Sequence, residues 1–114
     1  MKTFINQAAQ GDCFIKRIEG LPEGVKAMQP VDGHFIVAHS ETGHHHVLEA
    51  KPGIEVFEDM SDPETLYLSI VETEAVLEHL RSFDTHEPIG ISPGIYCVRR
   101  QREYTPEGWR RVAD

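Results

Sequence analysis

The chain of 114 residues contains no long hydrophobic run, and this absence narrows the class of protein. No stretch approaches the roughly 18 consecutive apolar residues that a transmembrane helix needs. Residues 1–12 carry one lysine and no apolar run of signal-peptide length. We therefore expect a cytoplasmic protein that has no membrane partner.

Cysteine is scarce, since Cys13 and Cys97 are the only two. They lie far apart in the sequence, and each falls in an apolar run typical of a strand. Without a secretion signal, two reduced cysteines are favoured over a disulfide. The length fits a single domain over residues 1–114, and such a domain buries a core without disulfides or a structural metal. Any bound metal is therefore expected to serve function.

Basic residues are fewer than acidic ones, and the formal net charge is −8 at pH 7. This balance argues against a generally nucleic-acid-binding surface. The basic residues are concentrated at the C-terminus, where residues 99–114 hold five arginines and three acidic residues. Ion pairs with the acidic body are the favoured role for these arginines, and contact with a phosphate or nucleic acid is the alternative. The candidate binding residues of this segment are Arg99, Arg102 and Tyr104.

Motifs of common enzyme mechanisms are missing as well. The sequence has no G-x-S-x-G element, no P-loop and no dinucleotide fingerprint. Neither cysteine has the surroundings expected of a nucleophile. Whether the protein is an enzyme stays open at this level.

What the sequence does contain is a series of short apolar runs separated by glycine, proline, aspartate and asparagine. Apolar and polar residues that alternate with a period of two are typical of β-strands. The expected strands are residues 13–18, 33–40, 44–50, 54–59, 65–72 and 95–104. Short strands at this spacing predict a mainly β fold, either a single small β-barrel or a β-sandwich.

Two further segments bear on the fold class. Residues 74–83 fit both a helix and a strand, and neither interpretation prevails. Residues 105–112 predict a short C-terminal helix, with Thr105 as the N-cap and Pro106 in the first helical position. Trp109, the only tryptophan, is expected to anchor this helix on the barrel.

Histidine is the most abundant candidate for chemistry, with seven in the chain and three in succession at positions 44–46. On a strand, His44 and His46 share one face, and two imidazoles at this spacing can chelate a divalent transition metal. His79 and His86 are the natural further ligands, and neighbouring carboxylates could orient an imidazole N–H. Those carboxylates are Glu78, Asp84 and Glu87.

Two alternative roles for the histidines stay open. A metal-free pocket could use two of them as a general acid and base, or hydrogen-bonded histidines could serve only to organise loops. The H-x-H element invites comparison with the cupin barrels. That comparison fails because Glu49 has the opposite strand parity and no histidine follows Pro93-Gly94 at the cupin spacing.

Four stretches together resemble a family of small, uncharacterised bacterial and phage-associated proteins. They are QGDCFIKRIEGLPEG, TGHHHVLEA, LEHLRSFDTHEPIGISPGIY and RRQREYTPEGWRRVAD. In that family a G-D strand, a G-H-x-H element and a terminal Q-R-E-Y-x-P-E segment recur in this order, and the terminal segment is its most specific part. The resemblance implies no activity. The positions that match are Gly43, His44, His46, His79, His86, Gln101, Arg102, Glu103 and Tyr104.

Two functional hypotheses follow. The first is a module that binds a metal or small ligand through His44, His46, His79 and His86. The alternative is a non-enzymatic interaction protein of a phage or mobile element, which contacts a protein or nucleic acid through its arginine-rich C-terminal segment. A homodimer that pairs edge strands is the default expectation for the oligomeric state.

Overall fold

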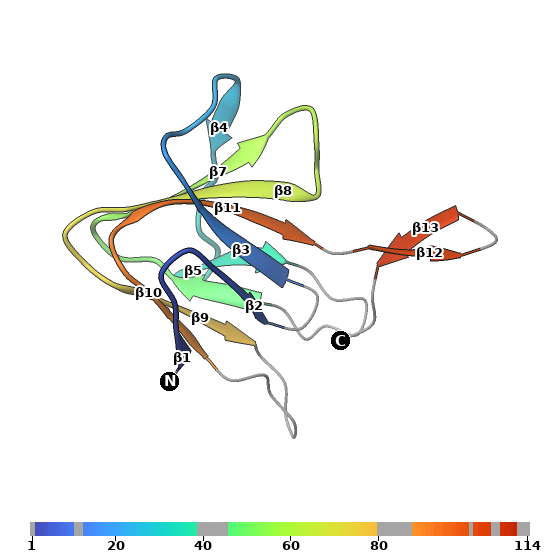
Figure 1. Ribbon diagram of the computed structural model, residues 1–114. Coiled ribbons are helices and arrows are strands. Elements are labelled where there is room, and N and C mark those ends of the chain that lie inside the picture. Colours follow the sequence, from blue (N-terminus) through green and yellow to red (C-terminus); the bar gives the residue numbers. More distant parts are fainter. Residues whose placement is uncertain are drawn as a thin grey trace.

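The computed structural model describes residues 2–10, 13–38, 46–79 and 88–100, and the strand backbones of 102–105 and 108–111. All regular structure in these residues is β-strand, arranged as two larger sheets and one two-stranded sheet (Figure 1). The predicted mainly β character is therefore confirmed.

The first sheet has five strands in the order β1-β10-β9-β6-β5. Only β1 and β10 pair in parallel, and the other neighbours are antiparallel. The strands are β1 (Lys2–Thr3), β10 (Ile89–Ile91), β9 (Ala75–His79), β6 (His46–Glu49) and β5 (His34–Ala38).

The second sheet has six strands in the order β2-β3-β11-β8-β7-β4, all antiparallel. The long central strands carry apolar residues at alternate positions, as the sequence pattern predicts. The strands are β2 (Gln7–Gln10), β3 (Cys13–Ile18), β11 (Gly94–Arg100), β8 (Thr65–Ile70), β7 (Ile54–Asp59) and β4 (Val25–Ala27).

The two sheets enclose one hydrophobic core. Each contributes alternate residues to it, such as Leu48 and Leu77 from the first sheet and Ile15, Leu68 and Val98 from the second, all of them buried. Because side chains alternate across a strand, the remaining residues of each strand lie on an outer face. The core thus fixes which positions of each sheet can meet solvent or a partner.

A closed barrel is not formed, which corrects one of the two expected architectures. Among the described strands, no hydrogen-bonded pair joins the two sheets. The edges are β1 and β5 in the first sheet and β2 and β4 in the second. β1 and β4 are very short, and the pairing of β5 is irregular between Ile36 and Ala38. Short and irregular edges of this kind end a sheet without pairing it further.

The prediction of a C-terminal helix over residues 105–112 is wrong. Residues in this segment instead form a two-stranded sheet of β12 (Arg102–Thr105) and β13 (Gly108–Arg111). The backbone register pairs Tyr104 with Trp109 and Thr105 with Gly108. Aromatic and β-branched residues favour strands, and that preference outweighs the capping signal of the Thr-Pro pair.

The ambiguous segment over 74–83 contains strand β9, and Leu80 to Phe83 lie outside the described residues. Ala75 and Leu77 are both buried in the core, as the strand interpretation requires. Four short strands, β1, β2, β4 and β10, were not expected from the sequence. β10 consists of only Ile89, Gly90 and Ile91, which is too short for a period-two pattern to be recognised.

Candidate functional site

His46 begins β6 and is completely buried at one end of the core. Its Nδ1 lies 2.8 Å from Oε1 of Gln10, the last residue of β2. The Gln10 side chain is buried as well, and its Nε2 donates to the carbonyl oxygen of Leu77 at 3.0 Å. A hydrogen-bonded relay therefore crosses the core from β9 through β2 to β6.

The relay decides which nitrogen of His46 carries a proton. The Leu77 carbonyl can only accept a hydrogen bond, so the Gln10 amide must present its NH2 group to it. Oε1 of Gln10 then faces the imidazole, and His46 must donate to it from Nδ1. In the neutral imidazole the lone pair is then on Nε2. An imidazole is commonly held in this way when its Nε2 binds a metal, because the second bond fixes the ring.

His79, the last residue of β9, is paired directly with His46 in the antiparallel register of β6 and β9. Residues that are opposite each other on antiparallel strands share a face of the sheet, with Cβ atoms about 4.5–5.5 Å apart. The structure therefore brings together two of the four predicted ligand positions at the level of the backbone. The other two, His44 and His86, lie outside the described residues.

Strand ends from both sheets meet at this end of the fold, which we call the histidine end. It is defined by Gln10, Cys13, Ala38, His46 and His79, the residues at which β2, β5 and β9 end and β3 and β6 begin. The chain that joins β5 to β6 comprises residues 39–45, and the chain that joins β9 to β10 comprises 80–88. These connections contain His44 and His86; the first enters β6 at His46, and the second leaves β9 at His79.

His34 is at the opposite end of β5 and takes no part in the histidine end. It is half-buried, and its Nδ1 donates to the carbonyl oxygen of Asp32 at 3.1 Å. This local bond fits the structural role that is one of the alternatives for the histidines. His39 and His45 lie outside the described residues.

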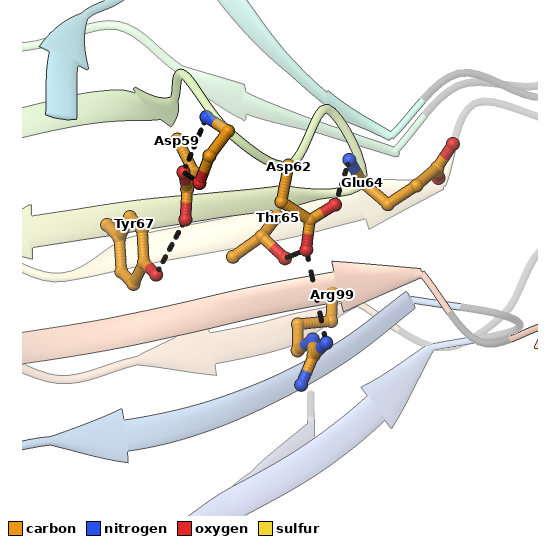
Figure 2. Close-up of polar contacts among 7 residues, drawn as sticks. Asp59, Asp62, Glu64, Thr65, Tyr67 and Arg99 are labelled. Atoms are coloured by element: carbon orange, nitrogen blue, oxygen red, sulfur yellow. Dashed lines mark hydrogen bonds and ion pairs between the residues drawn. The ribbon is translucent and has the colours of Figure 1, made fainter. Parts of the chain in front are cut away.

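Arg99, one of the candidate binding residues, is exposed on the outer face of the second sheet. Its Nη2 lies 4.0 Å from Oδ2 of Asp62, and both side chains are substantially exposed (Figure 2). An exposed pair at this distance contributes little to stability. The predicted ion pair with an acidic residue is thus present for Arg99.

The turn beside Arg99 is organised by two aspartates (Figure 2). Asp59 accepts hydrogen bonds from the hydroxyl and backbone N–H of Ser61, at 2.8 and 2.9 Å. Asp62 accepts them from the Thr65 hydroxyl at 2.7 Å and from the backbone N–H of Glu64 at 3.0 Å. The Ser61 bonds lower the pKa of Asp59, and the Thr65 hydroxyl lowers the pKa of Asp62. Both residues therefore form Asx-type turns whose carboxylates favour the charged state.

Two groups on the neighbouring strands have raised pKa values. Burial raises the pKa of Tyr67, whose hydroxyl donates to Asp59 at 3.3 Å, and burial also raises the pKa of the Cys97 thiol. Neither Cys13 nor Cys97 is in a disulfide, as predicted. With a raised pKa, Cys97 is protonated at neutral pH, which does not suit a nucleophile.

Arg102 and Tyr104 are in β12, whose backbone alone is described. The register pairs Arg102 with Arg111 and Tyr104 with Trp109. By strand alternation these four positions share one face of the two-stranded sheet. The candidate binding residues of the C-terminal segment are therefore divided between β11, which holds Arg99, and this separate sheet.

Gln10 is the residue that sequence reasoning missed. Its signal in the sequence is weak, because a glutamine before Gly11-Asp12 fits a turn as well as a buried strand end. Only the alternation with buried Ala8, two residues earlier, hints that Gln10 points into the core. Among the residues that the structure describes, no group of three or more His, Cys, Asp or Glu could hold a metal ion.

Comparison with known proteins identifies a family but no function. No curated protein and no solved structure gives a significant match to the chain. Within the described residues there is no helix with the length and hydropathy needed to span a membrane. A family model described as a domain of unknown function matches residues 9–101, so the C-terminal Q-R-E-Y segment lies almost entirely beyond the match. Because the model matches most of the sequence, the chain belongs to the family of this domain of unknown function, DUF8820.

Proposed function

We propose that the protein binds a divalent transition metal, or a small ligand held by the same imidazoles, at the histidine end. The observation that carries the proposal is the relay from Leu77 through Gln10 to His46, which holds one buried imidazole with Nδ1 as donor. A glutamine that is itself locked by a second bond provides the orientation expected behind a metal ligand.

The register supports a second ligand. His79 is opposite His46, and the connections between β5 and β6 and between β9 and β10 contain His44 and His86. Zinc and other transition metals accept imidazole nitrogen, and three or four such ligands complete a site. The proposed ligands are thus His44, His46, His79 and His86. A hydrolytic activity would in addition need a coordination position open to water.

Metal content measured by mass spectrometry on the untagged protein tests this proposal. We expect close to one equivalent of metal in the parent and little in a His44→Ala/His86→Ala variant. Both substitutions lie in connections and spare the buried His46, so the fold should survive. The matched control is His34→Ala, which removes a histidine at the other end of β5 and should leave the metal content unchanged.

Acid provides a second readout, because imidazoles must lose their protons to bind a metal. Metal retention should fall as the pH is lowered through the range in which histidines protonate, about pH 5–7. A parent protein that takes up no zinc, iron, nickel or manganese would refute metal binding. The relay would then be a structural feature of the core.

A second candidate function is favoured by the C-terminal register. Arg102 is directly opposite Arg111, and like charges in such a pair destabilise a hairpin unless an anionic group compensates them. This supports contact with an acidic protein or nucleic acid, as in an interaction protein of the phage-associated kind. Binding to a labelled oligonucleotide that weakens steeply with added salt, and is lost in Arg102→Ala, would support it.

A further inference from the structure

The outer face of the six-stranded sheet carries a continuous row of residues that are aligned by the strand register. Cys97 of β11 is paired with Lys16 of β3 on one side and Tyr67 of β8 on the other, and Tyr67 is in turn paired with Phe57 of β7. We call Lys16, Cys97, Tyr67 and Phe57 the outer row. Each of these residues has a strand neighbour buried in the core, so this row lies on the outer face; those neighbours are Ile15, Val98, Leu68 and Val56.

Apolar residues dominate the middle of this face. Cys97, Tyr67 and Phe57 are only partly exposed, and Ile18 and Ile95 form a second apolar pair beside the row. Burial among these neighbours raises the pKa of Tyr67 and Cys97. A contiguous apolar patch rimmed by polar residues on a small protein is typical of an interaction site.

Charge on this face is divided between its two halves. Exposed Lys16 and Arg99 are on β3 and β11, whereas exposed Glu55 and half-buried Asp59 are on the outer positions of β7. Asp62, which follows β7, adds to the acidic side. The face is therefore basic on one side of the boundary between β11 and β8 and acidic on the other.

We propose that this face binds a second copy of the chain, the copies being related by a twofold axis that runs parallel to the strands between β11 and β8. Such a rotation lays β3 of one copy over β7 of the other, and β11 over β8. The basic half of each copy then meets the acidic half of its partner, so this contact is made twice. Cys97 and Tyr67 of the outer row lie at the centre of the interface. A self-complementary patch of this kind is what a twofold interface requires.

The edges of both sheets are poorer candidates for self-association. β1 and β4 are very short, and the pairing of β5 is irregular between Ile36 and Ala38. Short or irregular edges offer few backbone groups to a neighbouring chain. The face is therefore preferred to the edge pairing that a β protein would suggest by default.

The area of the face indicates the affinity of the dimer that we expect. Six strands spaced about 4.8 Å apart, with a rise of about 3.4 Å per residue, give a face of roughly 25 by 20 Å. The area is about 500 Å² per copy, or about 1,000 Å² in total, which is at the lower limit of specific interfaces. We expect a reversible dimer with a dissociation constant in roughly the micromolar range.

Sedimentation velocity over about 1–500 μM brackets that range. The parent should shift from monomer to dimer as concentration rises, and Lys16→Glu or Glu55→Lys should each weaken the dimer at least about tenfold, because each places like charges opposite one another twice. The decisive sample is an equimolar mixture of K16E and E55K. It should recover dimer, since position 16 of each variant again meets the opposite charge at position 55 of the other. Glu49→Lys, an exposed reversal on the other sheet, is the control and should leave the dimer intact.

Thiol labelling identifies the face independently of these variants. Cys97 is partly exposed and lies in the row, whereas Cys13 is fully buried. A thiol reagent should therefore modify Cys97 first, and its rate should fall several-fold as the parent dimerises. A parent that stays monomeric at every concentration would overturn the proposal. So would a dimer that is indifferent to both charge reversals and leaves Cys97 labelling unchanged, because another surface would then form it.

Discussion

The two ends of the fold use polar side chains in different ways. At the end opposite the histidine end, Arg17 makes several hydrogen bonds at once. Its Nε donates to the Ile5 carbonyl at 3.0 Å, Nη1 to the Pro93 carbonyl at 3.3 Å and Nη2 to the Tyr96 hydroxyl at 2.8 Å. The guanidinium also lies 4.9 Å from the centre of the Tyr96 ring. One side chain thereby fastens two short connections to the core.

Glycine at position 94 makes this arrangement possible. Its φ is 154°, and a Cβ atom at this position would collide with Nη1 of Arg17, which its hydrogen bonds hold in place. The connection between β10 and β11 consists of residues 92 and 93 alone. This end of the molecule is therefore a closed, structural end.

The histidine end has the opposite character. The polar groups of Gln10 and His46 are inside the core, and the connections that begin there, residues 39–45 and 80–88, are long. Binding residues are commonly placed on longer connections that a rigid scaffold supports. We therefore expect rigidity at the Arg17 end, whereas the proposed binding function places its ligands at the histidine end.

Removing the glutamine of the relay should have the largest effect on stability. Gln10→Ala leaves the His46 N–H and the Leu77 carbonyl without this partner in the core, and each such group costs about 1–3 kcal/mol. We expect the free energy of unfolding in urea to fall by about 2–4 kcal/mol. The control is Gln7→Ala on the same strand, where the side chain is exposed and the effect should stay within about 0.5 kcal/mol. Equal effects of the two variants would show that the relay is energetically unimportant.

At the Arg17 end, loss of a single hydroxyl should lower the free energy of unfolding by less than Gln10→Ala does. Tyr96→Phe removes a bond to Arg17 and one to the Ser92 carbonyl, the latter at 2.7 Å, but Arg17 keeps its other partners. The expected loss is about 1–2 kcal/mol. Tyr67→Phe is the matched control, because its hydroxyl makes a longer bond of 3.3 Å at the surface, and it should cost about 0.5 kcal/mol or less. A larger loss at Tyr67 than at Tyr96 would contradict the assignment of rigidity to the Arg17 end.

The smallest effect on stability should appear at the acidic turn between β7 and β8, whose carboxylates are partly exposed. The pKa of Asp62 is lowered mainly by the Thr65 hydroxyl, so its charged form is favoured in the folded state. The stability this gives is present above the ordinary pKa of 3.8 and is lost as the pH falls through the lowered value. Because the side chain is 39% exposed, the contribution should be less than about 1 kcal/mol.

Nuclear magnetic resonance titration of the Asp62 carboxyl distinguishes the causes of this shift. Thr65→Val should raise the pKa of Asp62 toward 3.8, and Arg99→Ala should raise the same pKa by less, because the hydroxyl contributes more than the charge. The opposite order would mean that the ion pair controls the turn.

Most of the strands could be predicted from the sequence, and the failures have identifiable causes. β3 and β7 have the predicted bounds because each opens with buried apolar residues two apart, Cys13 and Ile15 in β3 and Ile54 and Val56 in β7. β2 was missed because Ala8 and Ala9 give almost no contrast between its faces. The C-terminal helix was wrong because a capping signal within one turn was given more weight than the strand preference of Tyr104 and Trp109.

Two of the four proposed ligand positions are adjacent in the structure. Strand parity and residue type picked out His46 and His79, which the structure pairs, and proposed His44 and His86, which lie outside the described residues. No sequence argument could connect Gln10 to His46, because their side chains meet only when two sheets pack together. The same holds for the outer row, whose four members come from four strands.

The sequence by itself determined a mainly β chain without a disulfide and with a histidine-rich segment, because these depend on composition and on periodicity within single strands. Only the tertiary structure decided that the sheets stay open, that Gln10 orients His46 and that one outer face is divided into basic and acidic halves. The physical reason is that each of these features is a contact or alignment between residues far apart in the sequence. Strand order and register create such contacts, and neither can be read from local alternation.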